Sequence, residues 1–158
     1  MITYGTGSGA TTLAAFDSAL FDAGIANHNL LHLSSIIPEG FIPSVEKADL
    51  NYKGGFGDKM YAVIAQQRET RKGHWAWAGL GWVATETHPR KGLFVEHSGE
   101  TENEVITMIN KSLTSMAAYR KETYGPIQHK TIGIACEDEP VCAVVAAIYE
   151  TEGWKGFV

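Results

Sequence analysis

The chain has 158 residues, of which 44% are hydrophobic and 20% are charged, and its formal net charge is −5 at neutral pH. This length fits one globular domain, and the composition is not that of a disordered, collagen-like or coiled-coil protein. The absence of a basic cluster argues against a nucleic-acid partner, and no apolar run reaches the length of a membrane span. We therefore expect one domain, residues 1–158, that binds neither nucleic acid nor membrane.

The start of the chain and its cysteines and histidines bear on the expected location and on metal binding. No basic segment followed by an apolar one opens the chain, so the expected location is cytoplasmic. Cys136 and Cys142 match no zinc or redox spacing, and the histidines lack the paired spacing of metal ligands. We expect buried thiols and no metal.

The first predicted elements are a short strand at residues 2–4, a glycine-rich loop over residues 5–9 and a helix over residues 12–23. Apolar residues at helical spacing indicate the helix, and Gly24 takes the place of a C-terminal cap. Asp17 lies on or beside this apolar face, where a carboxylate is costly unless a cation meets it. It either pairs with a Lys or Arg of the chain or receives a cationic ligand.

Two adjacent serines, Ser34 and Ser35, interrupt an apolar run over residues 30–38 that is typical of a buried strand. Such a pair can be inert filler within a strand. It can also be a peptide bond that cuts itself and converts the second serine into a pyruvoyl group. The run alone leaves both interpretations open.

The rest of the chain predicts five strands and one long helix. The strands cover residues 60–65, 75–83, 92–96, 131–135 and 141–149. The helix begins after Thr101 with the spacing of a capping box, carries an apolar stripe and is expected to end near Tyr124. Glu96 closes the third of these strands. A partly desolvated carboxyl there would have a raised pKa and hold a proton near neutral pH, whereas an exposed strand end would leave an ordinary surface acid.

Together these segments resemble the pyruvoyl-dependent arginine decarboxylases. The resemblance is nearly continuous from Thr3 to about Pro38, and it resumes at Val95-Glu96 and in the long helix. Its most specific motifs are Asn27-x-Asn29 and Ser34-Ser35-Ile36-Ile37-Pro38. The chain departs from the family in two places, because Ala26 stands where glycine is common and His28 lies between the two asparagines.

The resemblance implies an α+β protein with a four-layer α/β/β/α sandwich. It also implies an autocatalytic cut between Ser34 and Ser35, which leaves a β chain of residues 1–34 and an α chain of residues 35–158. The α chain would begin with a covalent pyruvoyl group derived from Ser35. This group replaces pyridoxal phosphate as the electron sink, so neither that cofactor nor a metal is expected.

The resemblance assigns roles to three further residues. Asn29 would support the cleavage site, Glu96 would be the general acid, and Asp17 would receive the guanidinium of the substrate. The implied reaction turns L-arginine into agmatine and CO₂ in a trimer, or a dimer of trimers, with active sites between subunits. The alternatives are a decarboxylase of lysine, ornithine or histidine, and an unprocessed, non-catalytic assembly module.

Overall fold

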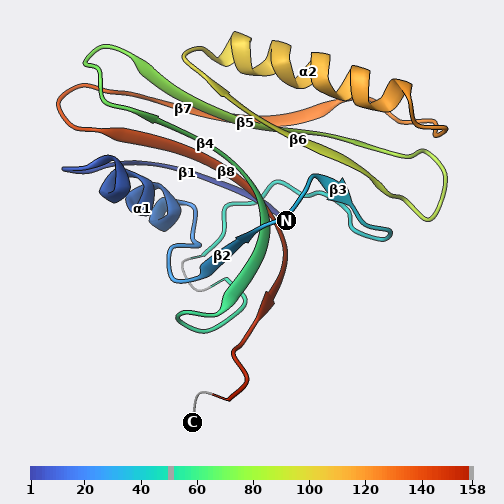
Figure 1. Ribbon diagram of the computed structural model, residues 1–158, viewed down its shortest axis with the longest axis horizontal. Helices are drawn as coiled ribbons and strands as arrows, with labels where there is room; N and C mark the ends of the chain where they lie inside the picture. The colour runs from blue at the N-terminus through green and yellow to red at the C-terminus, as the bar shows by residue number, and fades with distance from the viewer. Residues whose placement is uncertain (50–51, 157–158) are drawn as a thin grey trace.

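The computed structural model describes residues 1–49 and 52–156, which form two four-stranded sheets and two helices (Figure 1). The elements in chain order are β1 (Ile2–Ser8), α1 (Thr12–Asp22), β2 (Asn29–His32), β3 (Ile36–Ile37), β4 (Lys59–Glu69), β5 (Trp75–Ala84), β6 (Gly92–Gly99), α2 (Glu102–Ala118), β7 (Gln128–Ala135) and β8 (Val141–Glu152). One sheet has the strand order β1-β8-β4-β2, and the other has the order β3-β6-β5-β7.

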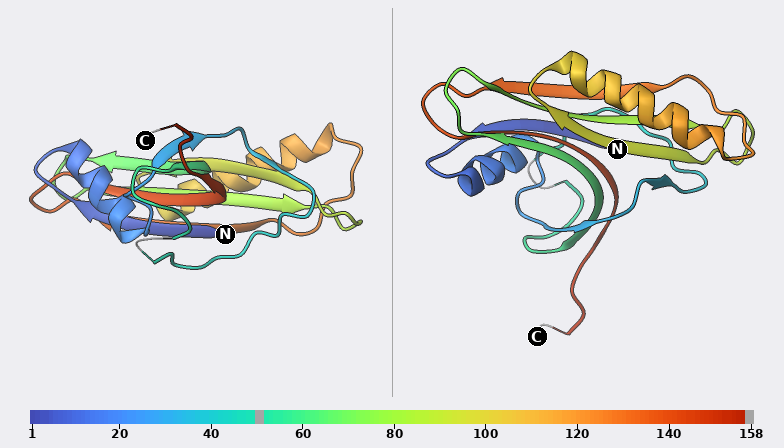
Figure 2. Two further views of the ribbon diagram at one scale, coloured as in Figure 1. Left: turned by 90° about the horizontal axis from the view of Figure 1, so that it is seen from below. Right: turned by 45° about the horizontal axis from the view of Figure 1, so that its top comes forward.

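The sheets pack face to face, with α1 on the outside of the first and α2 on the outside of the second (Figures 1 and 2). Apolar side chains such as Val63, Leu80 and Phe94 fill the space between the sheets. Two further clusters lie beneath the helices, one under α1 and one under α2. The predicted four-layer α/β/β/α sandwich of an α+β protein is confirmed.

The glycine-rich segment after the first strand was expected to be a loop, and this expectation is wrong. β1 continues through it to Ser8 because α1 lies directly against the glycines. A Cβ atom on Gly5 would lie 2.3 Å from the carbonyl oxygen of Ala19, and one on Gly7 would lie 2.3 Å from the Ala19 nitrogen. Missing side chains therefore let this helix and strand pack closely.

The apolar run around the serine pair does not form the predicted buried strand. It divides into β2 and β3, which are edge strands of different sheets and leave Ser34 and Ser35 between them. Each pairs with one neighbour only, β2 with β4 and β3 with β6. Much of the run therefore faces solvent, and Ile36 is 52% exposed.

Other predictions differ from the structure mainly in their boundaries. The long helix is capped by Thr101 as expected, but α2 ends at Ala118 and the chain reaches Tyr124 outside it. β6 continues past Glu96 to Gly99. Both cysteines are buried and unbridged, as predicted. Neither described helix is long and apolar enough to cross a membrane.

The close contact between β1 and α1 predicts that Gly5→Ala lowers the free energy of unfolding by about 2 to 3 kcal/mol, because the new methyl group meets main-chain atoms that cannot yield easily. Gly125→Ala is the control, since its new methyl would lie no closer than 3.6 Å to another heavy atom. Urea unfolding of both variants measures the difference. Equal stabilities would show that α1 does not depend on this approach.

Candidate active site

The serine pair lies where the chain crosses from one sheet to the other, and it is tied to both. On the upstream side, the Leu33 amide donates to the Ala62 carbonyl of β4 at 2.9 Å. On the downstream side, the Phe94 amide of β6 donates to the Ser35 carbonyl at 2.8 Å. The Ser34–Ser35 peptide is thus held between two anchors in different sheets.

Ser35 and Glu96 are in direct contact although 61 residues separate them. The Ser35 hydroxyl donates to Oε2 of Glu96 over 2.6 Å, and the Ser35 side chain is half-buried. A carboxylate at this distance is placed to accept the proton of the hydroxyl as its oxygen attacks a carbonyl. The sequence left open whether Glu96 is partly desolvated or an exposed acid at a strand end. In this single chain its side chain is exposed, and it lies inside β6 and not at its end.

The carbonyl of Ser34 has a hydrogen-bond donor of its own. The Ile36 amide donates to the Ser34 oxygen at 2.9 Å. A negative charge that develops on this oxygen would be stabilised by such an amide. A hydroxyl, a carboxylate that accepts its hydrogen bond and an amide that donates to the neighbouring carbonyl are therefore gathered within residues 34–36 and Glu96.

Tyr149 is a residue near the serine pair that sequence reasoning missed. Its hydroxyl donates to the Ile36 carbonyl at 2.8 Å, and burial, together with the charge of Glu96, raises the pKa of Tyr149 to about 12. The hydroxyl therefore stays protonated and a donor at neutral pH. A tyrosine closing an otherwise apolar strand was the available signal in the sequence.

Asp17 lies on α1, and only part of the apolar stripe predicted around it faces the core. Leu13 and Phe21, one turn to either side, are 67% and 56% exposed, and Asp17 is exposed between them. The buried face of the helix carries Leu20 from this stripe together with Ala15 and Ala19, because small residues are needed against β1. Within residues 1–49 and 52–156 the side chain of Asp17 makes no hydrogen bond or ion pair.

Asp17 and Asn29 line one groove of about 680 Å³. The Asn29 amide group donates to the Gly57 carbonyl at 2.6 Å, which fixes the start of β2. His28 lines the same groove and is 9% exposed, and neither of its ring nitrogens has a hydrogen-bond partner among the described residues. No described hydrogen bond or ion pair joins Asp17 or Asn29 to the Ser35–Glu96 pair.

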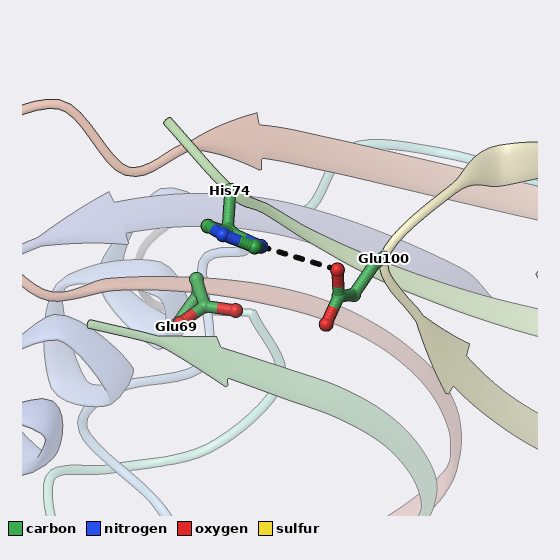
Figure 3. A group of neighbouring side chains, drawn as sticks. All are labelled: Glu69, His74 and Glu100. Carbon is green, nitrogen blue, oxygen red and sulfur yellow. Dashed lines mark hydrogen bonds and ion pairs between the residues drawn. The ribbon is translucent and has the colours of Figure 1, made fainter. Parts of the chain in front are cut away.

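Three residues at the end of β4, just before β5 and just after β6 are spaced as metal ligands are. Possible ligand atoms of Glu69, His74 and Glu100 lie within 4.8 Å of one another, and Figure 3 shows the contact of His74 with Glu100. Arg71 already neutralises both carboxylates, with its Nη2 2.6 Å from Glu69 Oε2 and 2.5 Å from Glu100 Oε1. We interpret the group as an ion-pair network that joins two turns.

Comparison with known proteins gives a consistent result. A family model described as pyruvoyl-dependent arginine decarboxylase matches residues 1–153. A protein of that name from Halobacterium salinarum is 33% identical over 152 residues, covering 94% of this chain and 91% of the relative. Relatives of the same name from Methanopyrus kandleri and Thermococcus kodakarensis are 32% and 31% identical, and the matches cover 91% and 90% of this chain and 90% and 88% of the relatives.

The network around Arg71 predicts an acid-sensitive contribution to stability. Arg71 and neighbouring main-chain amides lower the pKa of Glu69 from 4.5 to about 2. The stabilisation is therefore complete above pH 4.5 and declines as the pH falls toward 2. We expect the free energy of unfolding to fall more steeply over this range in the wild type than in Glu69→Gln, as measured by urea titrations at several pH values. Parallel pH profiles would contradict the assignment.

Proposed function

Because the chain belongs to the pyruvoyl-dependent arginine decarboxylase family, we propose that it converts L-arginine to agmatine and CO₂ with a pyruvoyl group formed from Ser35. Family membership makes the chain a carboxy-lyase. The observation that carries the proposal is the 2.6 Å contact between the Ser35 hydroxyl and Glu96. This contact gives a proton acceptor to Ser35, the serine from which the pyruvoyl group is proposed to form.

Self-cleavage follows from the arrangement around Ser34. Ser35 Oγ forms a bond to the Ser34 carbonyl carbon and gives its proton to Glu96, while the Ile36 amide stabilises the charged oxygen. The carbon–nitrogen bond between the two serines then breaks, and the nitrogen takes up a proton. The result is an ester that links the carboxyl carbon of Ser34 to the side chain of residue 35.

The ester then yields the cofactor by elimination. Loss of the α-proton of residue 35 breaks its Cβ–oxygen bond and releases the Ser34 carboxylate at the end of a chain of residues 1–34. The dehydroalanine that remains takes up one water and releases one ammonia. A second chain, residues 35–158, then begins with a pyruvoyl group.

In the decarboxylation, the pyruvoyl group supplies a carbonyl that takes up the electrons released when CO₂ leaves. Glu96 stays beside residue 35 because the β6–β3 pairing holds both segments. We assign it the delivery of the proton that replaces CO₂ on the α-carbon. Asn29 has a supporting role at the cleavage site. It is the first residue of β2, upstream of the serines, and its side chain is held by the Gly57 carbonyl.

The groove on α1 fits the guanidinium end of arginine. Asp17 presents a carboxylate without an ion-pair partner in the described chain, and a carboxylate matches a guanidinium in a two-pronged contact. His28 also lines this groove, although both of its ring nitrogens are buried and have no hydrogen-bond partner among the described residues. The Asp17 carboxylate favours a cationic substrate.

We infer that the working enzyme is a homo-oligomer, a trimer or a dimer of trimers, with each active site completed by a neighbouring copy. In the single chain the groove with Asp17 and the Ser35–Glu96 pair share no described contact. Leu13 and Phe21 beside Asp17, and Ile36 beside Ser35, are unusually exposed for apolar residues. Burying them against another copy would bring the two halves of the site together and desolvate both acids.

The processing chemistry predicts a complete loss of cleavage in one variant and a slower cleavage in another. Ser35→Ala lacks the attacking oxygen, so its chain stays intact. Glu96→Gln keeps the oxygen but lacks the proton acceptor, so the rate of cleavage falls by about 10²-fold or more. The measurement is the rate at which the 35–158 fragment accumulates on denaturing gels.

Glu137→Gln, a change of the same kind at an exposed turn outside the site, should cleave at the wild-type rate. Cleavage of Glu96→Gln at that rate as well would remove Glu96 from the reaction.

The substrate assignment predicts that Asp17→Asn raises the KM for arginine about 10-fold or more, with a smaller change in kcat, because a charged contact to the guanidinium is lost. Asp22→Asn makes the same change on the same helix, at a carboxylate that already pairs with Lys47. CO₂ release from arginine, lysine, ornithine and histidine completes the comparison. CO₂ release from another amino acid but not from arginine would overturn the assignment.

A further inference from the structure

Tyr149 contacts the segment that follows the serine pair from the opposite sheet. Its hydroxyl donates to the Ile36 carbonyl at 2.8 Å, and its ring packs against Phe41 and Phe94, with centroids 4.9 and 6.2 Å apart. The two aromatic neighbours restrict the ring. The hydroxyl is therefore a fixed donor and not a mobile one.

Tyr149 lies on the face of β8 that every second residue from Val141 to Ala147 turns toward the other sheet, and it sits beside an irregularity of the strand. Against β4, Ile148 pairs with Ala62 and Glu150 pairs with Tyr61, so Tyr149 is an extra residue without a register partner on that strand. β-bulges recur next to active sites. The phenol of Tyr149, on a strand of the first sheet, reaches a strand of the second.

The contact also supplies a hydrogen-bond donor to a main-chain carbonyl of β3 that faces away from its sheet. This strand has two residues and lies at the edge of its sheet, so the main-chain groups on its outer side have no neighbouring strand. Tyr149 takes the Ile36 carbonyl, and the Ile36 amide turns to the Ser34 oxygen. The two outward-facing polar groups of Ile36 are thus committed to the tyrosine and to the bond that is to be cut.

We propose that Tyr149 is a positioning residue for self-cleavage, whose hydroxyl holds β3 so that the Ile36 amide stays on the Ser34 carbonyl oxygen. The inference rests on the proposed cleavage between Ser34 and Ser35. As Ser35 Oγ bonds to the Ser34 carbon and its proton passes to Glu96, negative charge develops on the oxygen that Ile36 contacts. A looser β3 would supply that donor less often, and the attack would slow.

The groove beside β3 offers a matched control. It has a volume of about 340 Å³ and is lined by Ile36, Tyr61 and Tyr149, among others. Tyr61 donates its hydroxyl to Glu152 Oε2 at 2.9 Å and makes no contact with β3 through that hydroxyl. Tyr61→Phe therefore removes the same atom from the same groove and leaves the serine segment untouched.

The test compares wild type, Tyr149→Phe and Tyr61→Phe, each made by cell-free synthesis and followed by the growth of the 35–158 fragment. Tyr149→Phe should cleave about 10-fold more slowly than wild type, the effect of one lost hydrogen bond on a rate. Tyr61→Phe should stay within about 2-fold of wild type. The melting temperatures of all three should be similar, because the half-buried rings are retained.

A second measurement reads the position of β3 without cleavage. In the uncleavable Ser35→Ala background, Tyr149→Phe should speed hydrogen exchange of the amides of residues 35–37, and Tyr61→Phe should not. Equal cleavage rates of Tyr149→Phe and wild type would overturn the inference and leave the proposed function standing. Equal slowing of both tyrosine variants would also overturn it. A wild-type chain that never cleaves would overturn the proposed function itself.

Discussion

The chemistry assigned to this chain depends on one contact, the hydrogen bond from the Ser35 hydroxyl to Glu96. The contact exists because residues 33–35 leave one sheet and enter the other, which puts Ser35 opposite β6. Main-chain hydrogen bonds of Leu33 to β4 and of Ser35 to β6 hold the two ends of this crossing segment. A serine pair in the middle of a regular strand would have its peptide bond in the ladder and no carboxylate at its side chain.

The same crossing explains why the site is divided. The segment before the serines belongs to the sheet that carries α1, whereas the segment after them belongs to the sheet that carries Glu96. Asp17 and Asn29 therefore lie in a groove of their own. The exposed apolar residues around both regions provide the surface on which a second copy could join the two halves.

The sequence allowed the layers of the fold to be predicted better than the site. The stripe on α2 follows from side-chain periodicity and the Thr101 cap from the spacing of a capping box, and both are present. On α1 the large residues formed the more visible stripe, but close packing on glycines buries two alanines with Leu20 and leaves Leu13 and Phe21 exposed. The division of residues 30–38 between two sheets is a tertiary effect, since edge strands and buried strands can share one apolar composition. The bulge at Tyr149 depends on pairing between distant strands and leaves no local trace.

The mass of the polypeptide that begins at residue 35 tests the central claim most directly. Denaturing mass spectrometry of the purified protein should show residues 1–34 as one species and residues 35–158 as another. The larger species should be lighter by one ammonia than the same fragment with an amino-terminal serine, because residue 35 has become a pyruvoyl group. A single intact mass after prolonged incubation, or a fragment that keeps its serine, would contradict the account.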